Sequence, residues 1–359
     1  MTVRSVLSLA TGLGLSLAAC GGEAGGAGDG PTRGGSVDLT GAGATFPYPI
    51  YARWIASYEQ ARGVRINYGP IGSGAGIRQL SERTVDFGAS DSPMSAQEMA
   101  AAKGGPVLHV PMVIGAVVVA YNLPQVRQPI RLAGDVIGDM FLGRITKWND
   151  PRIAATNPGV ALPDVDVLVA HRTDASGTTY VFTDYLTAVS QPWANGPGRG
   201  KQVRWPTGLG ARGNEGVAAQ VRNMPGAIGY TELAYAKQTE LQVAAIRNQA
   251  GSFIAPAIEN VQAAAEGALA ALPADTDFRI SIVNAPGAQA YPISTLTWIL
   301  LYEQQADSVK GRKLVDFLRW ALTEGSQQAA ALDYAPLPAA LVERVLARLD
   351  AVKLGEAAP

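Results

Sequence analysis

Short apolar runs alternate with stretches of helical periodicity from Val37 to the end of the chain. The apolar runs are rich in β-branched and aliphatic residues and are bounded by turn-forming or polar residues, a pattern typical of strands. They cover 64–68, 85–89, 113–121, 165–170 and 293–302. Strands that alternate with helices indicate an α/β architecture. The sequence shows no repeat of fixed period and no heptad pattern.

Amphipathic patterns predict where the helices begin. After Phe46, the residues Ile50, Trp54 and Tyr58 recur at steps of four, and two prolines suit the first turn of this helix. A second apolar stripe follows Thr178. We expect both stripes to face the core rather than a ligand. Three further helices are expected over 309–322, 326–332 and 337–352.

The first 36 residues have a different pattern. A positively charged start, Met1–Arg4, precedes an apolar run, Ser5–Ala19, and this layout predicts a signal peptide over residues 1–19. The run is shorter than the roughly twenty residues of a transmembrane helix. Residues 21–36 contain eight glycines in sixteen positions. We therefore expect residues 20–36 to form a tether and the folded part to begin near Val37.

Cys20, the single cysteine of the chain, lies at the expected cleavage point. Its surroundings, Leu17-Ala-Ala-Cys-Gly21, resemble the lipobox of bacterial lipoproteins. The resemblance implies that Cys20 is acylated and anchors the mature protein to a membrane without spanning it. One cysteine cannot form an internal disulfide. With His109 and His171 as the only histidines, no zinc site is expected either.

Composition narrows the class of function. The chain has 359 residues, a length that suits two domains, and a formal net charge of −1. Nucleic-acid-binding proteins normally carry a concentrated basic excess, and a chain that is 47% hydrophobic is not disordered in bulk. We therefore expect no nucleic-acid partner, no metal and no cofactor, and we look for function among hydroxyls, arginines and backbone amides.

Three glycine-rich loops with hydroxyl groups lie where a helix is expected to begin, and the second and third of them also follow an expected strand. They are Gly41–Pro47, Gly72–Gly76 and His171–Thr179. Free amides at a helix start can face an anion, while a plain turn with a threonine cap is the competing interpretation of the first loop. The second loop, with a helix expected near Ile77, lacks the glycine patterns of dinucleotide and triphosphate sites.

The third loop and a separate turn carry charge. Arg172 offers a planar fork that suits a tetrahedral oxyanion, and Asp174 is expected to orient its guanidinium. Ser176 and Thr178 offer further donors. A surface ion pair beside a capped helix is the alternative interpretation of this motif. Asp91 follows the strand over 85–89, where an aspartate before Ser-Pro is usually a turn former.

Seven blocks of sequence, in this order, resemble the phosphate-binding protein of the bacterial high-affinity phosphate ABC transporter. They are Gly41–Pro47, Val85–Asp91, Phe141–Trp148, Arg172–Thr178, Trp205–Gly210, Pro225–Tyr230 and Leu332–Tyr334. The resemblance implies a type II periplasmic-binding-protein fold, in which a hinge of two chain crossings joins two α/β lobes around a ligand cleft. By motif, the first lobe comprises residues 37–112 plus 291–359, and the second comprises residues 113–290.

The same resemblance implies a ligand set for inorganic phosphate. It consists of Thr45, Phe46 through its backbone amide, Ser73, Asp91, Arg172, Ser176, Gly177 and Thr178. Asp174 would support Arg172 without touching the ligand. The chain departs from the family pattern in the second loop, where Gly74 replaces a serine and Ala75 replaces a glycine. No side-chain contact is therefore expected from position 74.

The proton of phosphate gives Asp91 a specific task. At neutral pH phosphate keeps at least one proton, which an ionised carboxylate can accept, whereas sulfate has the same shape and no proton. We therefore expect Asp91 to disfavour sulfate by about two or more powers of ten in affinity. Two alternatives remain open. The first is a binding protein for sulfate, molybdate or another oxyanion. The second is a phosphate-handling hydrolase that uses Ser73 or Ser176, for which His171 is expected to point the wrong way.

Partners and location follow from the resemblance as well. It implies a monomeric, non-enzymatic lipoprotein in the cell envelope that delivers phosphate to the permease subunits of an ABC transporter. Removal of residues 1–19 takes away one charged side chain, Arg4, so the net charge of the mature chain changes from −1 to −2. Affinity for an anion must then come from local donors rather than from the summed field of the protein.

Overall fold

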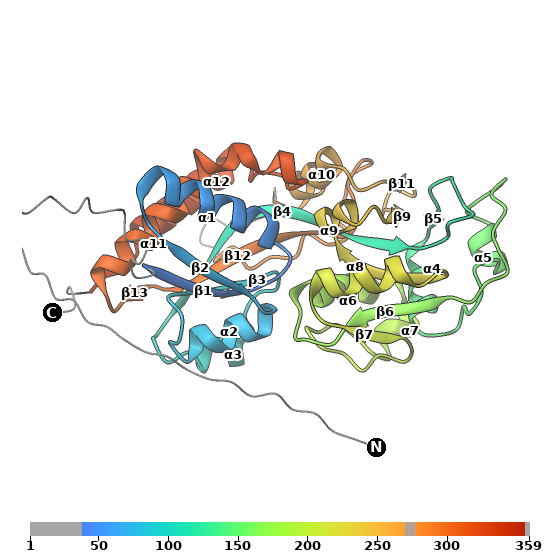
Figure 1. Cartoon of the computed structure of the whole chain (residues 1–359), viewed down its shortest axis with the longest axis horizontal. Coiled ribbons are helices and arrows are strands. Elements are labelled where there is room, and N and C mark those ends of the chain that lie inside the picture. Colours follow the sequence, from blue (N-terminus) through green and yellow to red (C-terminus); the bar gives the residue numbers. More distant parts are fainter. Residues whose placement is uncertain (1–37, 270–271, 273–276, 356–359) are drawn as a thin grey trace, which may run out of the picture. The chain divides into compact units, whose positions relative to one another are not determined.

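The fold is built on a nine-stranded mixed sheet (Figure 1). Its longest strand, β4 (Val107–Tyr121), pairs with one group of strands along its first part and with a second group along its second part. The structure is a computed structural model that describes residues 38–269, 272 and 277–355. The predicted signal peptide, Cys20 and the glycine-rich tether lie outside the described residues. Residues 107–116 of β4 pair with β12 (Ser294–Tyr302), and residues 117–121 pair with β8 (Ala227–Glu232), antiparallel in both cases.

The first part of β4 borders a group of four strands in the order β2-β1-β3-β12. Strand β1 is parallel to β2 and β3, and β12 is antiparallel to β3. Helices α1 and α11 lie over one face of these strands and α2 over the other (Figure 1). The elements are β1 (Leu39–Gly43), α1 (Tyr48–Arg62), β2 (Ile66–Pro70), α2 (Ser73–Ser81), β3 (Phe87–Ser90), α3 (Ala96–Ala100), β13 (Gln304–Gln305), α11 (Ser308–Leu322), η1 (Gly325–Gln328), η2 (Ala330–Leu332), α12 (Ala339–Asp350) and β14 (Lys353–Leu354).

The second part of β4 borders the strands β8-β6-β7, in which β6 is parallel to both neighbours. Adjacent residues of β8 face opposite layers. Gly229 packs against Val217 and Val221 of α8, whereas the ring of Tyr230 stacks on Phe182 of α6, 4.4 Å away. The elements are β5 (Arg131–Leu132), α4 (Gly134–Phe141), α5 (Pro151–Ala154), β6 (Leu168–Arg172), α6 (Gly177–Val189), α7 (Gln191–Ala194), β7 (Leu209–Ala211), α8 (Gly213–Asn223), α9 (Leu233–Gln238), β9 (Gln242–Val243), β10 (Ala245–Arg247), β11 (Phe253–Ile254) and α10 (Ile258–Leu269).

The expected α/β class is confirmed, and each of the five expected strands is present with shifted ends. The largest shift is in β4, which begins at Val107 rather than at residue 113. Pro111, which lacks a backbone donor, lies in the added part of this strand. In the structure Pro111 pairs with Trp298 next to a register shift in β12, a place where a sheet tolerates proline.

Helix α2 begins at Ser73, four residues before the expected start near Ile77. Gly72, with φ of 95°, turns the chain, and its carbonyl accepts bonds from the amides of Ala75 and Gly76. A Cβ on Gly76 would lie 2.5 Å from the Ala42 carbonyl oxygen. The small residues that suggested an open loop therefore form the first helical turn and allow it to pack closely on β1.

The segment over 326–332 forms two 3-10 turns rather than the expected α-helix. The indole Nε1 of Trp54 donates to the carbonyl of Gly325 at 2.7 Å, a bond between residues far apart in sequence. That carbonyl is the one an α-helix would offer to the amide of Ala329. The Ala329 amide instead bonds to the Ser326 carbonyl, 3.1 Å away. The remaining C-terminal helices, α11 and α12, are confirmed, and α12 begins after Pro338.

The lobe boundaries expected from the sequence remain a prediction. Strand β4 changes its pairing partner from β12 to β8 between Ala116 and Val117, close to the expected boundary at 112/113. In the described part of the chain, no helix combines the length and the apolar character needed to cross a membrane.

Gly115 in β4 offers a test of how the sheet positions the loop after β1. A methyl group on Gly115 would lie 2.6 Å from the buried ring of Phe46, so we predict that Gly115→Ala lowers the free energy of unfolding by about 1–3 kcal/mol. Urea unfolding measures this. Gly69→Ala is the matched control, because its methyl group would meet nothing closer than 3.9 Å. Equal stability of the two variants would contradict the described packing.

Candidate functional site

The three glycine–hydroxyl loops and Asp91 converge where strands β1, β3 and β6 end. Thr45 follows β1, Ser73 opens α2, Asp91 follows β3, Arg172 ends β6 and Ser176 caps α6. The side-chain members of the expected ligand set are between 0% and 3% exposed. The structure therefore brings together residues from all four segments that the sequence singled out.

Ser73, Gly177 and Asp91 form the centre of this cluster. The hydroxyl of Ser73 accepts bonds from the amides of Gly177 (3.1 Å) and Asp91 (3.3 Å). Its Oγ lies 3.5 Å from Oδ2 of Asp91. A Cβ on Gly177 would lie 2.5 Å from Ser73 Oγ and 2.6 Å from Asp91 Oδ2. Only glycine allows the start of α6 to approach the carboxyl group this closely.

Burial of the Asp91 carboxyl group controls its ionisation. Desolvation raises its pKa to about 7, against the opposing effects of a hydrogen bond from Thr297 and the charge of Arg172. The Thr297 hydroxyl donates to Oδ1 at 2.9 Å. A carboxylic acid with this pKa takes up or releases a proton in the neutral range. The group can therefore either accept or donate a hydrogen bond near physiological pH.

Arg172 is held in one orientation by Asp174. Its Nε donates to Oδ1 of Asp174 at 2.7 Å and a terminal nitrogen donates to Oδ2 at 2.5 Å. The other terminal nitrogen lies 3.4 Å from the hydroxyl of Thr178. Burial acts to raise the pKa of Asp174, but the hydrogen bond and charge of Arg172 outweigh it, so that the pKa is lowered. The contact expected between Asp174 and the guanidinium is therefore present, and Asp174 remains ionised.

Contacts between the loops explain the departure at Gly74. The amide of Gly74 donates to the carbonyl of Ala175 at 2.9 Å. A Cβ at position 74 would lie 2.4 Å from the Cβ of Ala175, so a serine would not fit opposite this alanine. Nearby, the ammonium group of Lys201 lies 2.6 Å from a carboxylate oxygen of Glu98 on α3. A main-chain bond thus joins the loops that follow β2 and β6, and an ion pair joins α3 to the segment after α7.

Several polar residues around the site were not anticipated. The amide Nδ2 of Asn214 donates to the hydroxyls of Thr45 (2.8 Å) and Thr178 (3.1 Å). Tyr235 donates to the Thr45 carbonyl, and Tyr334 donates to the Phe46 carbonyl, each at 2.6 Å. Tyr334 belongs to one of the resemblance blocks, but its contact was not predicted. In the sequence, Thr297 stands out only as a hydroxyl residue within an apolar run, and nothing marks Asn214 as part of a site.

His171 makes its contacts away from the serine and threonine hydroxyls of the site. Its ring stacks on Trp205, with 4.8 Å between ring centroids, and Nδ1 lies 3.2 Å from the Arg172 carbonyl oxygen. Burial lowers its pKa. Within the described ranges, no group of three or more metal-binding side chains is found.

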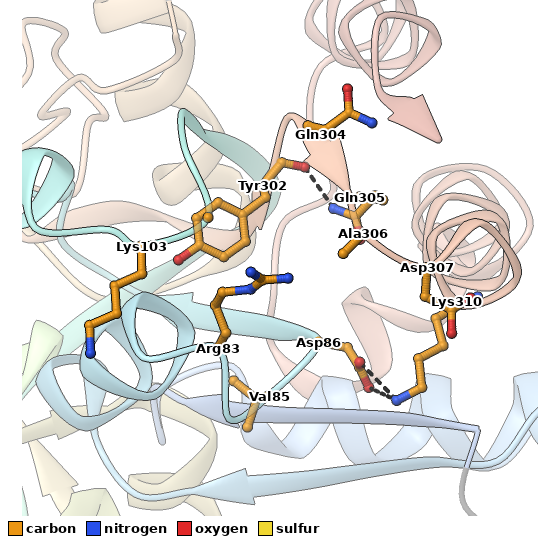
Figure 2. Close-up of a pocket in the computed structure, with 11 residues that line it drawn as sticks. Arg83, Val85, Asp86, Lys103, Tyr302, Gln304, Gln305, Ala306, Asp307 and Lys310 are labelled. Carbon is orange, nitrogen blue, oxygen red and sulfur yellow. Dashed lines mark hydrogen bonds and ion pairs between the residues drawn. The ribbon is translucent and has the colours of Figure 1, made fainter. Parts of the chain in front are cut away.

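A separate cavity of about 370 Å³ lies at the opposite end of β3 and β12 (Figure 2). Lys310 on its wall is paired with Asp86 at 3.0 Å, and Lys103 is paired with Glu82. Asp307 caps α11 through the amides of residues 309 and 310. The cavity shares no lining residue with the expected ligand set, and these charged groups are already engaged, so we place the candidate site at Asp91.

The chain is similar in sequence and in structure to known phosphate-binding proteins. A profile of the PBP superfamily domain matches residues 25–324. The chain is 43% identical over 311 residues to the phosphate-binding protein PstS of Pasteurella multocida, covering 86% of this chain and 89% of the relative. It is also 43% identical to the PstS of Xylella fastidiosa, with 86% and 84% covered. The structure resembles that of the phosphate-binding protein from Stenotrophomonas maltophilia, with a TM-score of 0.68, 20% identity and coverage of 86% and 93%. This likeness confirms the expected two-lobed α/β fold.

The raised pKa of Asp91 predicts how stability depends on pH. An unfolded aspartate has a pKa near 4, whereas Asp91 in the folded protein has a pKa of about 7. The folded state is therefore most stable below pH 4, where Asp91 keeps its proton, and it loses this stability as pH rises through about 7. Over this range Asp91 should cost the anion-stripped protein about 4 kcal/mol of unfolding free energy. Urea unfolding from pH 4 to 8 measures the loss. Asp91→Asn removes the titration, and parallel pH profiles for the two proteins would contradict the assignment.

Proposed function

The chain belongs to the phosphate-binding protein family of the PBP superfamily, and we propose that it binds inorganic phosphate for delivery to an ABC permease. One observation carries the proposal beyond family membership. A buried carboxyl group, Asp91, lies among hydroxyl and amide donors at the start of a helix. An anion that brings its own proton suits this combination of donors with one acceptor.

The donors of the proposed site match the acceptor oxygens of phosphate. We assign them to Thr45, the backbone amide of Phe46, Ser73, Arg172, Ser176, Gly177 and Thr178. The amide of Gly177, which donates to Ser73 in this structure, would donate to the ligand instead. Helix α6 begins at Gly177, and backbone amides in the first turn of a helix favour a bound anion. The carbonyl of Phe46 is already bonded to Tyr334, which supports the amide as its contribution. Arg172 would supply a charged donor whose direction Asp174 sets.

Asp91 would select for a ligand that carries a proton. Above pH 7 its carboxylate accepts a hydrogen bond from phosphate, whereas sulfate places an oxygen with no hydrogen against it. Below pH 7 the protonated group donates instead, and sulfate becomes acceptable. This behaviour disfavours the alternative of a sulfate or molybdate carrier at neutral and higher pH. The discrimination would therefore depend on pH.

We propose that the chain has no enzymatic activity of its own. Its relatives are phosphate-binding proteins. The carboxyl group beside Ser73 is Asp91, which we assign to the proton of the ligand, and in the described part of the chain no ionisable side chain bonds to the hydroxyl of Ser176. His171, the histidine of the third loop, is stacked on Trp205. Incubation of purified protein with a phosphomonoester tests this: we expect no release of alcohol, and turnover that is lost in Ser73→Ala or Ser176→Ala would establish the hydrolase instead.

The mature protein would be a monomeric lipoprotein of the cell envelope, outside the cytoplasmic membrane. The supporting observation is the sequence Leu17–Gly21, in which Cys20 follows an apolar run and precedes a glycine-rich stretch. Acylation of Cys20 would hold the binding domain near the permease. Mass spectrometry of the native N-terminus should find residues 1–19 removed and Cys20 lipidated; an unmodified Cys20 or an intact leader would refute the anchor.

The choice between phosphate and sulfate tests the proposed function. We predict that Asp91→Asn, whose amide donates at every pH, reduces the preference for phosphate over sulfate by about 100-fold or more at pH 8. In the wild-type protein, sulfate affinity should rise as pH falls through about 7, and Asp91→Asn should lose this dependence.

Calorimetric titration at pH 8 and pH 6 measures both effects. Asp174→Asn is the comparison variant, because it weakens the support of Arg172 and leaves the Asp91 acceptor in place. It should lower the affinities for both anions together. An unchanged phosphate preference in Asp91→Asn would overturn the role of Asp91 in selecting the ligand.

A further inference from the structure

One buried amide connects two hydroxyls of the proposed ligand set. Asn214 is the second residue of α8, and it is 0% exposed. Its Nδ2 donates to Oγ1 of Thr45 at 2.8 Å and to Oγ1 of Thr178 at 3.1 Å. These two threonines come from different ends of the sheet, since Thr45 follows β1 and Thr178 lies in the first turn of α6. The Asn214 side chain therefore joins one threonine from each of the two parts of the sheet.

The orientation of the Asn214 amide is determined by its other partners. Its Oδ1 accepts a bond from the backbone amide of Glu232 at 3.0 Å and lies 3.2 Å from the hydroxyl of Thr231. A backbone amide can only donate, so the oxygen of Asn214 must face Glu232. The NH2 group must then face the two threonines. Each of its two hydrogens has one hydroxyl as its acceptor.

The two hydroxyls have both acceptor positions occupied. A hydroxyl oxygen has two lone pairs and one hydrogen. Thr45 Oγ1 also accepts from the backbone amide of Asn214 at 3.3 Å, and Thr178 Oγ1 also accepts from Arg172 at 3.4 Å. Only the hydrogen of each hydroxyl is left. Among the described residues neither hydrogen has an acceptor, so both are available to an oxyanion.

We propose that Asn214 is a positioning residue that turns the hydroxyl hydrogens of Thr45 and Thr178 toward the bound anion. This inference rests on the proposed phosphate function and adds to it a residue that does not itself touch the ligand. The chemistry requires a neutral donor at this position. A carboxylate there would accept from the same hydroxyls, turn their hydrogens away from the anion and add a negative charge beside it.

Asn214→Asp tests the proposal with almost no change in shape. We expect its affinity for inorganic phosphate at pH 8 to be about 100-fold weaker than that of the wild-type protein. As pH falls toward 5, protonation of the new carboxyl group restores one donor, so the deficit relative to wild type should shrink by about tenfold. A residue with a merely structural role would not give this pH-dependent recovery. Titration calorimetry over pH 5–8 measures both effects.

Asn157→Asp is the matched control. Asn157 is also buried, at 4% exposed, and its amide bonds to the backbone of Arg131 and Ile153, away from the site. This variant should bind phosphate as the wild-type protein does at every pH. If the wild-type protein itself binds no phosphate, the proposed function fails. If wild type binds and Asn214→Asp binds equally well, or is weakened equally at every pH, the positioning role is overturned.

A double-mutant cycle decides the question if Asn214→Asp does not fold. Asn214→Ala should weaken phosphate binding about tenfold in the wild-type background. When Thr45→Val and Thr178→Val have removed both hydroxyls, the same substitution should change affinity by less than about twofold, because the amide then has nothing to orient. Equal losses in the two backgrounds would show that Asn214 does not act through these hydroxyls.

Discussion

The burial of the Asp91 carboxyl group is the constraint around which the site is arranged. A carboxylate without water or a cationic partner is costly, and Arg172, the nearby cation, is already paired with Asp174. Two hydroxyls, from Thr297 and Ser73, are the protein groups that face the carboxyl group. Desolvation by burial raises the pKa of Asp91 to about 7, although both hydroxyls act to lower it. A ligand that supplies a hydrogen to this carboxylate relieves the cost, and one without a hydrogen does not.

The remaining groups of the site supply donors without adding much charge. The negative charge of Asp174 offsets that of Arg172, and the chain as a whole has a net charge of −1. Attraction for an anion must then come from fixed hydroxyls, backbone amides and the start of α6, whose directions are set in advance. Asn214 belongs to this arrangement because it leaves each threonine one hydrogen to give. Close approaches by Gly177 and Gly74 let the loops meet.

The sequence was sufficient to predict the α/β class and the segments that form the site. Five strands showed as apolar runs, and Ser73, Asp91 and Arg172 lie in short motifs next to three of them. Strand β1 before Thr45, with the sequence Leu-Thr-Gly-Ala-Gly, was not predicted. Contacts made by remote segments could not be predicted in this way. Trp54 donates to the Gly325 carbonyl where 3-10 turns replace the expected α-helix, and a Cβ at position 74 would collide with Ala175. Asn214 and Thr297 join the site through the packing of α8 and β12, which leaves no local pattern.

The most direct measurement is calorimetric titration of the phosphate-stripped wild-type protein with phosphate and with sulfate at pH 8, above the pKa of Asp91. The mechanism predicts saturable binding of one phosphate per chain and an affinity for sulfate that is weaker by about 100-fold or more. Sulfate binding within about tenfold of phosphate would contradict discrimination by a buried proton acceptor. Absence of phosphate binding would contradict the proposed function.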